Sequence, residues 1–236
     1  MRLYDECFEG VKRILDEHPV KKLDFASAPK WQETDKNKII FQSDTAFELG
    51  GNNLPALSGV ALTDSYSLVP DDEVLLIGRD LTEINGDSPF ARIALIRVKE
   101  SEMGTGEQLY QAVRKIEFAR YHIHPEGYMM RISAFTHREA ARVGRDALKK
   151  RLGFAHIGRF FIKEYKKQPQ VEAVKLLFVT DENFPYDLLE QVMKKSESIT
   201  TALDHIMRDI KMDCTSCSLK AVCDEVEALC AGGDNP

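Results

Sequence analysis

The stretch VEAVKLLFVTDE, residues 171–182, gives the strongest strand signal in the chain and decides the fold class. It is a short apolar run that ends at Asp181 and Glu182, which is typical of a strand buried inside a sheet. The next stretch, FPYDLLEQVMKKS (184–196), has apolar residues at helical spacing. A buried strand followed by an amphipathic helix indicates a sheet with helices packed against it.

Shorter strand signals precede this stretch. Each is apolar and bounded by Gly, Pro or Asp, as strands in a compact domain usually are. We expect strands at KIIFQ (38–42), DTAFELGG (44–51), ALSGVALT (56–63), VLLIG (74–78), FARIALIRVKE (90–100) and YMMRISAF (128–135).

Helical periodicity marks the remaining elements. Residues 3–18 form an amphipathic helix, which a polar loop follows to residue 37. Thr136 and Glu139 have the spacing of a capping box at the start of a helix. Further helices are expected at 106–123, 137–152, 155–168, 184–196 and 199–210.

These elements predict an α+β fold, a mixed sheet with packed helices, rather than a purely doubly wound fold. Strands and helices alternate only in the second half of the chain, which favours this arrangement. The expected α+β domain covers residues 1–210, of which 1–37 are the N-terminal helix and loop. Residues 211–236 form a C-terminal cysteine-rich segment.

Charge is distributed unevenly along the chain. The net charge is −6, yet residues 111–170 contain fourteen Lys or Arg against five Asp or Glu, a balance of +9. Such a patch attracts phosphate or other anions, although basic residues can also be solvated helix faces. Guanidinium groups match phosphate geometry. The candidate anion-binding residues are Arg114, Arg120, Arg131, Arg138, Arg142 and Arg145.

Composition excludes several classes of protein. No apolar run approaches the ~20 residues that a membrane span requires, so no membrane partner is expected. The charged N-terminal helix is unlike a secretory signal, which predicts a cytoplasmic protein. A nucleic-acid partner is not expected, because the net charge is negative and RKIEFARYHIHPEGY (114–128) contains no recognised reader motif.

Four of the five cysteines lie within residues 214–230, at the spacing C-x2-C-x5-C-x6-C. In the cytoplasm, closely spaced cysteines are more often metal ligands than disulfides. Unequal intervals within one short segment are more typical of iron–sulfur ligation than of zinc, which usually has two close pairs. Zinc and reduced, buried thiols are the alternatives. The predicted ligands of a 4Fe-4S cluster are Cys214, Cys217, Cys223 and Cys230.

Cys230 differs from the other three cysteines in its distance along the chain from the nearest of them. If KAVCDEVEALC (220–230) is helical, Cys223 and Cys230 lie two turns apart, about 10 Å along the axis. A cubane then reaches both only if the helix frays or the side chains reach inward. Cys7 is the alternative fourth ligand.

The chain carries in order DTAFELGG, VLLIGRDLTEI, YMMRISAFTHREAARVGRDALKKRLGFAHIGRFF, VKLLFVTDE and a C-x-x-C. In this order the segments resemble the middle domain of acetyl-CoA synthase and the start of its metal-cluster domain. That enzyme is the β subunit of the carbon monoxide dehydrogenase/acetyl-CoA synthase complex. The resemblance covers about residues 40–230. It implies an α+β unit associated with coenzyme A binding, and an Fe4S4 cubane held by four cysteines.

Carried over residue by residue, Cys214 and Cys217 match the opening pair of that cubane, and Cys223 and Cys230 match the later two at shorter intervals. The chain also departs from the family. It contains no Cys-x-Cys, so the distal nickel of the family has no ligands. Met129 and Met130 precede Arg131, where the family's strand is expected to carry a tryptophan.

These observations predict a small iron–sulfur protein related to acetyl-CoA synthase, in anaerobic one-carbon metabolism based on carbon monoxide and acetyl-CoA or on corrinoids. Its basic segment would bind coenzyme A or a partner such as a dehydrogenase or a corrinoid protein. The alternative is a non-catalytic accessory, electron-transfer or scaffold protein with a structural zinc or no metal. The sequence contains no convincing catalytic constellation, which keeps this alternative open.

Overall fold

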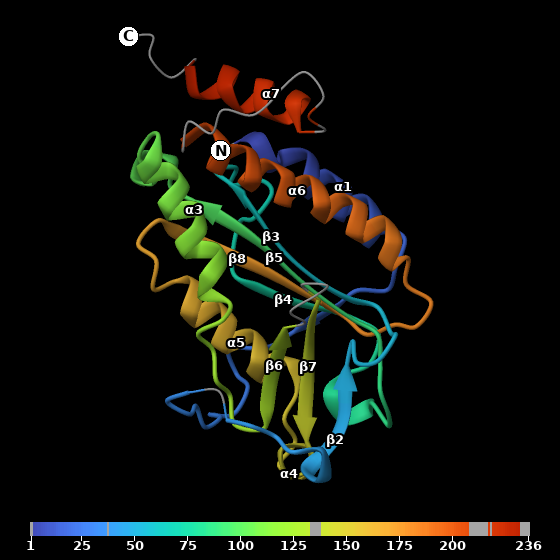
Figure 1. The fold of residues 1–236 in the computed structure, drawn as a ribbon. Coiled ribbons are helices and arrows are strands. Elements are labelled where there is room, and N and C mark those ends of the chain that lie inside the picture. Colours follow the sequence, from blue (N-terminus) through green and yellow to red (C-terminus); the bar gives the residue numbers. More distant parts are fainter. Residues whose placement is uncertain (1, 37, 133–137, 208–216, 218, 232–236) are drawn as a thin grey trace.

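A computed structural model of the chain describes residues 2–36, 38–132, 138–207, 217 and 219–231. In this part of the chain a five-stranded sheet, with the strand order β1-β4-β8-β5-β3, lies at the centre (Figure 1). Its strands are β1 (Lys21–Leu23), β3 (Ala56–Thr63), β4 (Glu73–Ile77), β5 (Phe90–Val98) and β8 (Val171–Val179).

Strand β8 is the middle strand of this sheet. It pairs in parallel with β4 and antiparallel with β5, and β3 pairs in parallel with β5. Leu176, Leu177 and Phe178 are each at most 1% exposed. Because successive residues of a strand point to opposite faces, both faces of β8 are buried. The prediction of an α+β fold with a mixed sheet and packed helices is confirmed.

Helices cover both faces of the five-stranded sheet. On one face α6 packs with α1, and Gly59 of β3 lies so close to Met193 that a Cβ there would be 2.3 Å from its Cε. On the other face α5 packs against β4 and β8, with Gly158 beside Val74. The α-helices are α1 (Asp5–Asp16), α2 (Glu100–Met103), α3 (Glu107–Ala119), α4 (Arg145–Lys149), α5 (Phe154–Tyr165), α6 (Tyr186–Met207) and α7 (Lys220–Ala231), and the 3-10 turns are η1 (Arg2–Tyr4), η2 (Gln42–Asp44) and η3 (Leu81–Glu83).

A three-stranded antiparallel sheet with the order β2-β7-β6 lies in the lower part of Figure 1. In β7 Glu139, Ala141 and Val143 are buried, whereas Ala140 and Arg142 are only partly buried. This alternation gives the strand one face toward the protein core and one face away from it. The strands are β2 (Thr45–Leu49), β6 (Tyr128–Ile132) and β7 (Glu139–Gly144).

The helix predicted at residues 137–152 is wrong. Residues 139–144 form β7, and only Arg145–Lys149 are helical, as α4. The Glu139 carboxylate binds Arg92 and Arg120 rather than a helix N-terminus, and Thr136 lies outside the described residues. Tertiary contacts therefore override the helical propensity of this alanine-rich stretch.

The strand predicted at residues 38–42 is also absent from the described structure. Side chains bind the backbone of Ile40 there: its N–H donates to Met129 Sδ at 3.3 Å, and its carbonyl accepts from Arg142 Nη1 at 2.7 Å. Ile39 and Phe41 are 69% and 65% exposed. In contrast, the segment expected to be a loop contains β1, which pairs with β4.

The two helices predicted at 184–196 and 199–210 form one helix, α6 (Tyr186–Met207). The stretch SESITT resembles a helix boundary, because Ser and Thr often cap helices. In α6 Ser198 and Thr201 instead donate to the carbonyls of Lys194 and Glu197, each at 2.9 Å. Hydroxyl groups that bond back in this way allow a helix to continue.

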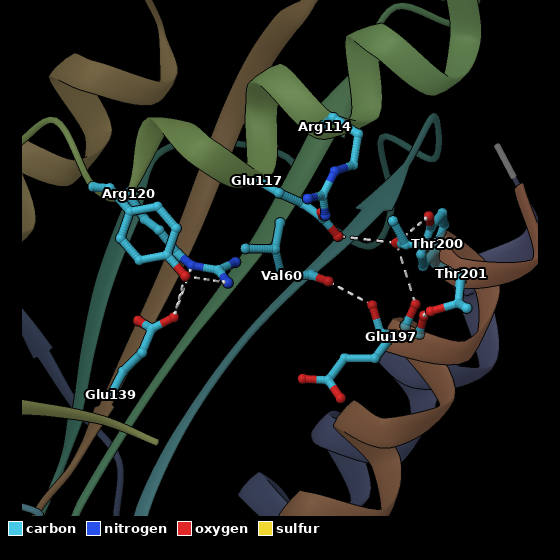
Figure 2. Close-up of polar contacts among 11 residues, drawn as sticks. Val60, Arg114, Glu117, Arg120, Glu139, Glu197, Thr200 and Thr201 are labelled. Carbon is cyan, nitrogen blue, oxygen red and sulfur yellow. Dashed lines mark hydrogen bonds and ion pairs between the residues drawn. The ribbon is translucent and has the colours of Figure 1, made fainter. Parts of the chain in front are cut away.

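A buried ion cluster connects the two sheets. Arg92 of β5 and Glu139 of β7 are 3% and 5% exposed, and they form an ion pair. Glu139 Oε1 also accepts hydrogen bonds from Arg120 Nε at 3.0 Å and Tyr121 Oη at 2.7 Å (Figure 2). Burial alone would raise the pKa of Glu139, but the charges of Arg92 and Arg120 and the Tyr121 hydrogen bond lower this pKa to about 2. The carboxylate is therefore ionised and fully partnered in the core.

We predict that Glu139→Gln lowers the free energy of unfolding at neutral pH by about 3–5 kcal/mol, because Arg92 keeps its buried charge without a counter-charge. Urea unfolding followed by circular dichroism measures this loss. Glu182→Gln is the matched control, since Glu182 and its partner Arg79 are 64% and 52% exposed. The control should cost less than about 1 kcal/mol. Equal losses in the two variants would contradict a special role for the buried pair.

The stability difference between the wild type and Glu139→Gln should depend on pH. The pKa of Glu139 falls from 4.5 to about 2 on folding, so its contribution is present above about pH 4.5 and is lost as the pH falls toward 2. The lowered pKa corresponds to roughly 3 kcal/mol. Urea unfolding of both proteins between pH 7 and pH 2.5 should show the two stabilities converging below pH 4.5. A constant difference across this range would exclude an ionised Glu139 as the cause.

Candidate functional site

Four of the six predicted arginines line one pocket. Arg131 comes from β6, Arg142 from β7 and Arg145 from the first turn of α4, and Arg138 directly precedes β7. The pocket has a volume of about 730 Å³, and strand β2 and the loop after it complete its wall. Ala140 and Arg142 line the pocket from one face of β7, and Glu139 lies on the opposite face. One face of this strand therefore contributes to the pocket and the other to the ion cluster.

Glu48 of β2 organises two of these arginines. It lies directly opposite Arg142 in the β2–β7 register. Its Oε1 atom accepts from Arg142 Nη2 at 2.6 Å and Nε at 2.9 Å, and from Arg131 Nη1 at 2.7 Å. Arg142 Nη2 also donates to the Gln42 side chain at 3.1 Å. Both guanidinium groups are therefore held in place by the same carboxylate oxygen.

The loop after β2 gives Glu48 the room that it occupies. A Cβ at Gly51 would lie 2.6 Å from Glu48 Cβ and 2.7 Å from Glu48 Oε2, so this position requires glycine. Gly50 and Asn52 have φ values of +66° and +53°, in the left-handed region that these two residue types tolerate best. In the sequence Gly50 and Gly51 are only the end of the expected strand 44–51, and their place next to Glu48 was not expected.

Asp87 supports the same wall of the pocket. Its Oδ1 accepts from the backbone N–H of Glu48 at 2.8 Å, and its Oδ2 accepts from Asn52 Nδ2 at 2.9 Å. Neither Glu48 nor Asp87 was predicted as a site residue. Residues 44–51 were recognised as a strand, but partners 83 to 94 positions away in the chain cannot be identified from spacing alone.

The described lining of the pocket carries excess positive charge. Four arginines face two carboxylates, Glu48 and Asp87, a balance of +2. Arg138 donates to the carbonyl of Leu54. Arg145 is exposed and forms no hydrogen bond or ion pair with any residue in the described part of the chain. Guanidinium groups without a counter-charge are suited to bind a phosphate or carboxylate group.

The other two predicted arginines lie elsewhere. Arg120 belongs to the buried cluster with Glu139 (Figure 2). Arg114 of α3 donates to Glu117 Oε2 at 2.9 Å, and Glu117 Oε1 accepts from Thr200 of α6 at 2.9 Å (Figure 2). Both arginines therefore bind carboxylates of the protein itself, and neither lines the pocket.

The predicted metal ligands are only partly within the described residues. Cys214 lies outside them, and Cys230 lies in α7 without a described side chain. Cys217 and Cys223 are both partly buried, and Cys217 precedes the first turn of α7, where its carbonyl accepts from Lys220 N–H at 3.2 Å.

The helical geometry makes Cys230 a difficult ligand. Cys223 and Cys230 lie in the continuous helix α7, about 10 Å apart along its axis at ~1.5 Å per residue. One compact cluster cannot contact both unless the last turns of α7 unwind. Among the described residues, no group of three or more His, Cys, Asp or Glu side chains is placed to hold a metal ion.

Cys7 is a poor substitute for the fourth ligand. It is 1% exposed in the hydrophobic core, and burial raises its pKa to about 11. Metal ligation requires the thiolate, whereas Cys7 is held as a neutral thiol. It packs as a small hydrophobic side chain of α1.

Two further observations concern the chain as a whole. None of the helices in the described ranges is both long enough and apolar enough to cross a membrane. No protein-family model and no curated protein matches this chain.

Proposed function

We propose that this chain is a small iron–sulfur protein related to acetyl-CoA synthase that binds a phosphate-bearing ligand, coenzyme A being the first candidate. The observation that carries the proposal is the convergence of Arg131, Arg138, Arg142 and Arg145 on one pocket with an excess of positive charge. In the sequence these arginines are related only because they lie in one basic segment, whereas in the fold they line the same pocket. Its cellular setting would be cytoplasmic, anaerobic one-carbon metabolism.

The size and chemistry of the pocket support an organic phosphate as its ligand. A volume of about 730 Å³ lies in the usual range of small-molecule sites, and a free phosphate ion would fill only a small part of it. Coenzyme A carries several phosphate charges, which guanidinium groups bind through paired hydrogen bonds. The resemblance to acetyl-CoA synthase and the charge of the pocket therefore favour the same ligand.

The alternative is an accessory, electron-transfer or scaffold protein with a structural zinc or no metal, which docks on a dehydrogenase or a corrinoid protein. The placement of Cys223 and Cys230 two turns apart in α7 favours this alternative. With that spacing, only three of the four cysteines can share one compact metal site. The described lining of the pocket also includes no His or Cys, and its two carboxylates, Glu48 and Asp87, are engaged by groups of the protein itself. Ligand binding without catalysis fits this lining.

We predict that coenzyme A binds with an affinity that falls as salt rises, and that Arg131→Ala or Arg145→Ala weakens binding about tenfold or more. The loss of a charge-assisted hydrogen bond to phosphate is the physical reason. Isothermal titration calorimetry at two salt concentrations measures the effect. Arg13→Ala, on the remote helix α1, is the matched control and should bind as the wild type does. No binding at millimolar coenzyme A would remove this ligand from the proposal.

We also predict that protein purified without oxygen contains iron and acid-labile sulfide and absorbs visible light. Cys214→Ser, Cys217→Ser and Cys223→Ser should each lose most of the iron, because each removes a thiolate ligand. Cys7→Ser is the control and should retain it. Full iron content in Cys230→Ser would mean that the fourth ligand lies elsewhere. A colourless protein with one zinc would contradict the iron–sulfur assignment and favour the alternative.

A further inference from the structure

Glu48 holds an unusual position for a carboxylate in a site that favours anions. It is 13% exposed, and its Oε1 atom receives three donor groups from Arg131 and Arg142. An anionic ligand that enters the pocket meets these two arginines with a counter-charge already beside them. Glu48 therefore occupies donor groups of Arg131 and Arg142 that an anionic ligand would otherwise use.

The structure fixes this carboxylate in place rather than leaving it free to move away. Gly51 borders its second oxygen so closely that no side chain could fit there. Asp87 accepts from the backbone N–H of Glu48 at 2.8 Å, and the N–H of Ser88 donates to the Glu48 carbonyl at 3.0 Å. The backbone of Glu48 is held on both sides in this way, and its carboxylate is held by Arg131 and Arg142, so the charge is a permanent part of the pocket.

A fixed counter-charge changes which ligands can bind. Two guanidinium groups that share one carboxylate retain a balance of +1; Arg138 and Arg145 add two positive charges and Asp87 removes one, which leaves +2. Electrostatic attraction grows with the product of the ligand charge and the potential of the pocket. When the potential is lowered, singly charged anions gain too little to bind, whereas a ligand with adjacent charges still gains enough.

We propose that Glu48 is an internal counter-anion that excludes singly charged anions from the pocket and restricts it to ligands with two or more adjacent negative charges, such as a diphosphate. This inference rests on the proposed anion-binding function of the same pocket. It adds to that function a minimum ligand charge of two and assigns this selectivity to Glu48.

The test is calorimetric titration of the full chain with inorganic pyrophosphate and, separately, with acetate. The wild type should bind pyrophosphate and not acetate. Glu48→Gln should bind pyrophosphate about tenfold more tightly and should also bind acetate measurably, because the shape of the side chain is kept and its charge is removed. Glu126→Gln is the matched control: Glu126 pairs with Lys150 at 3.7 Å and does not line this pocket. It should behave as the wild type.

A second variant and a double mutant distinguish the effect of the lost charge from an effect of misfolding. Glu48→Ser removes the same charge and should show the same gain, with thermal melting as the check on folding. Because Glu48 acts through Arg131 and Arg142, the gain should shrink when Glu48→Gln is combined with Arg131→Gln. Unchanged or weaker pyrophosphate binding in folded Glu48 variants would overturn the inference.

The outcomes also separate this inference from the proposed function. If the wild type binds pyrophosphate and Glu48→Gln binds it no better, the anion-binding function stands and the role of Glu48 is wrong. If only the Glu48 variants bind pyrophosphate, the proposed minimum ligand charge is wrong, because Glu48 then excludes diphosphates as well. If neither binds, both proposals fail.

Discussion

The ion cluster of Arg92, Glu139 and Arg120 is the constraint on which the rest of the structure depends. It joins β5 of the five-stranded sheet to β7 of the three-stranded sheet through side chains that are almost fully buried. An unpaired charge in such a place is strongly destabilising, so the two sheets are held in one relative position. A slip of β7 by one residue would exchange its two faces, turning Glu139 out of the core and Arg142 toward it.

The geometry of the pocket follows from that fixed register. Glu139 faces the core, so Ala140 and Arg142 must face the pocket, and Glu48 lies directly opposite Arg142 on β2. Arg131 comes from β6, on the other side of β7, and reaches the same Glu48 oxygen. The pocket is therefore built across all three strands of the small sheet, and its arginines are positioned before any ligand arrives.

The sequence could predict the parts of this arrangement that depend on local pattern. The apolar run of β8 indicated a buried strand, and the excess of basic residues in 111–170 pointed to Arg131 and Arg142, which line one pocket. It could not predict β7, because EAARVG has the composition of a helix and becomes a strand through pairing with β2 and β6. Nor could it predict Glu48, whose role depends on the pairing of β2 with β7.

The two candidate sites lie at opposite ends of the molecule. Helix α7, which carries Cys223, packs on α6 in the upper part of Figure 1, whereas the small sheet with Arg142 lies in the lower part. The five-stranded sheet and its helices lie between them. A metal held by the cysteine segment would therefore not touch a ligand bound by the arginines. Any chemistry that uses both sites would therefore need a partner protein or a second chain.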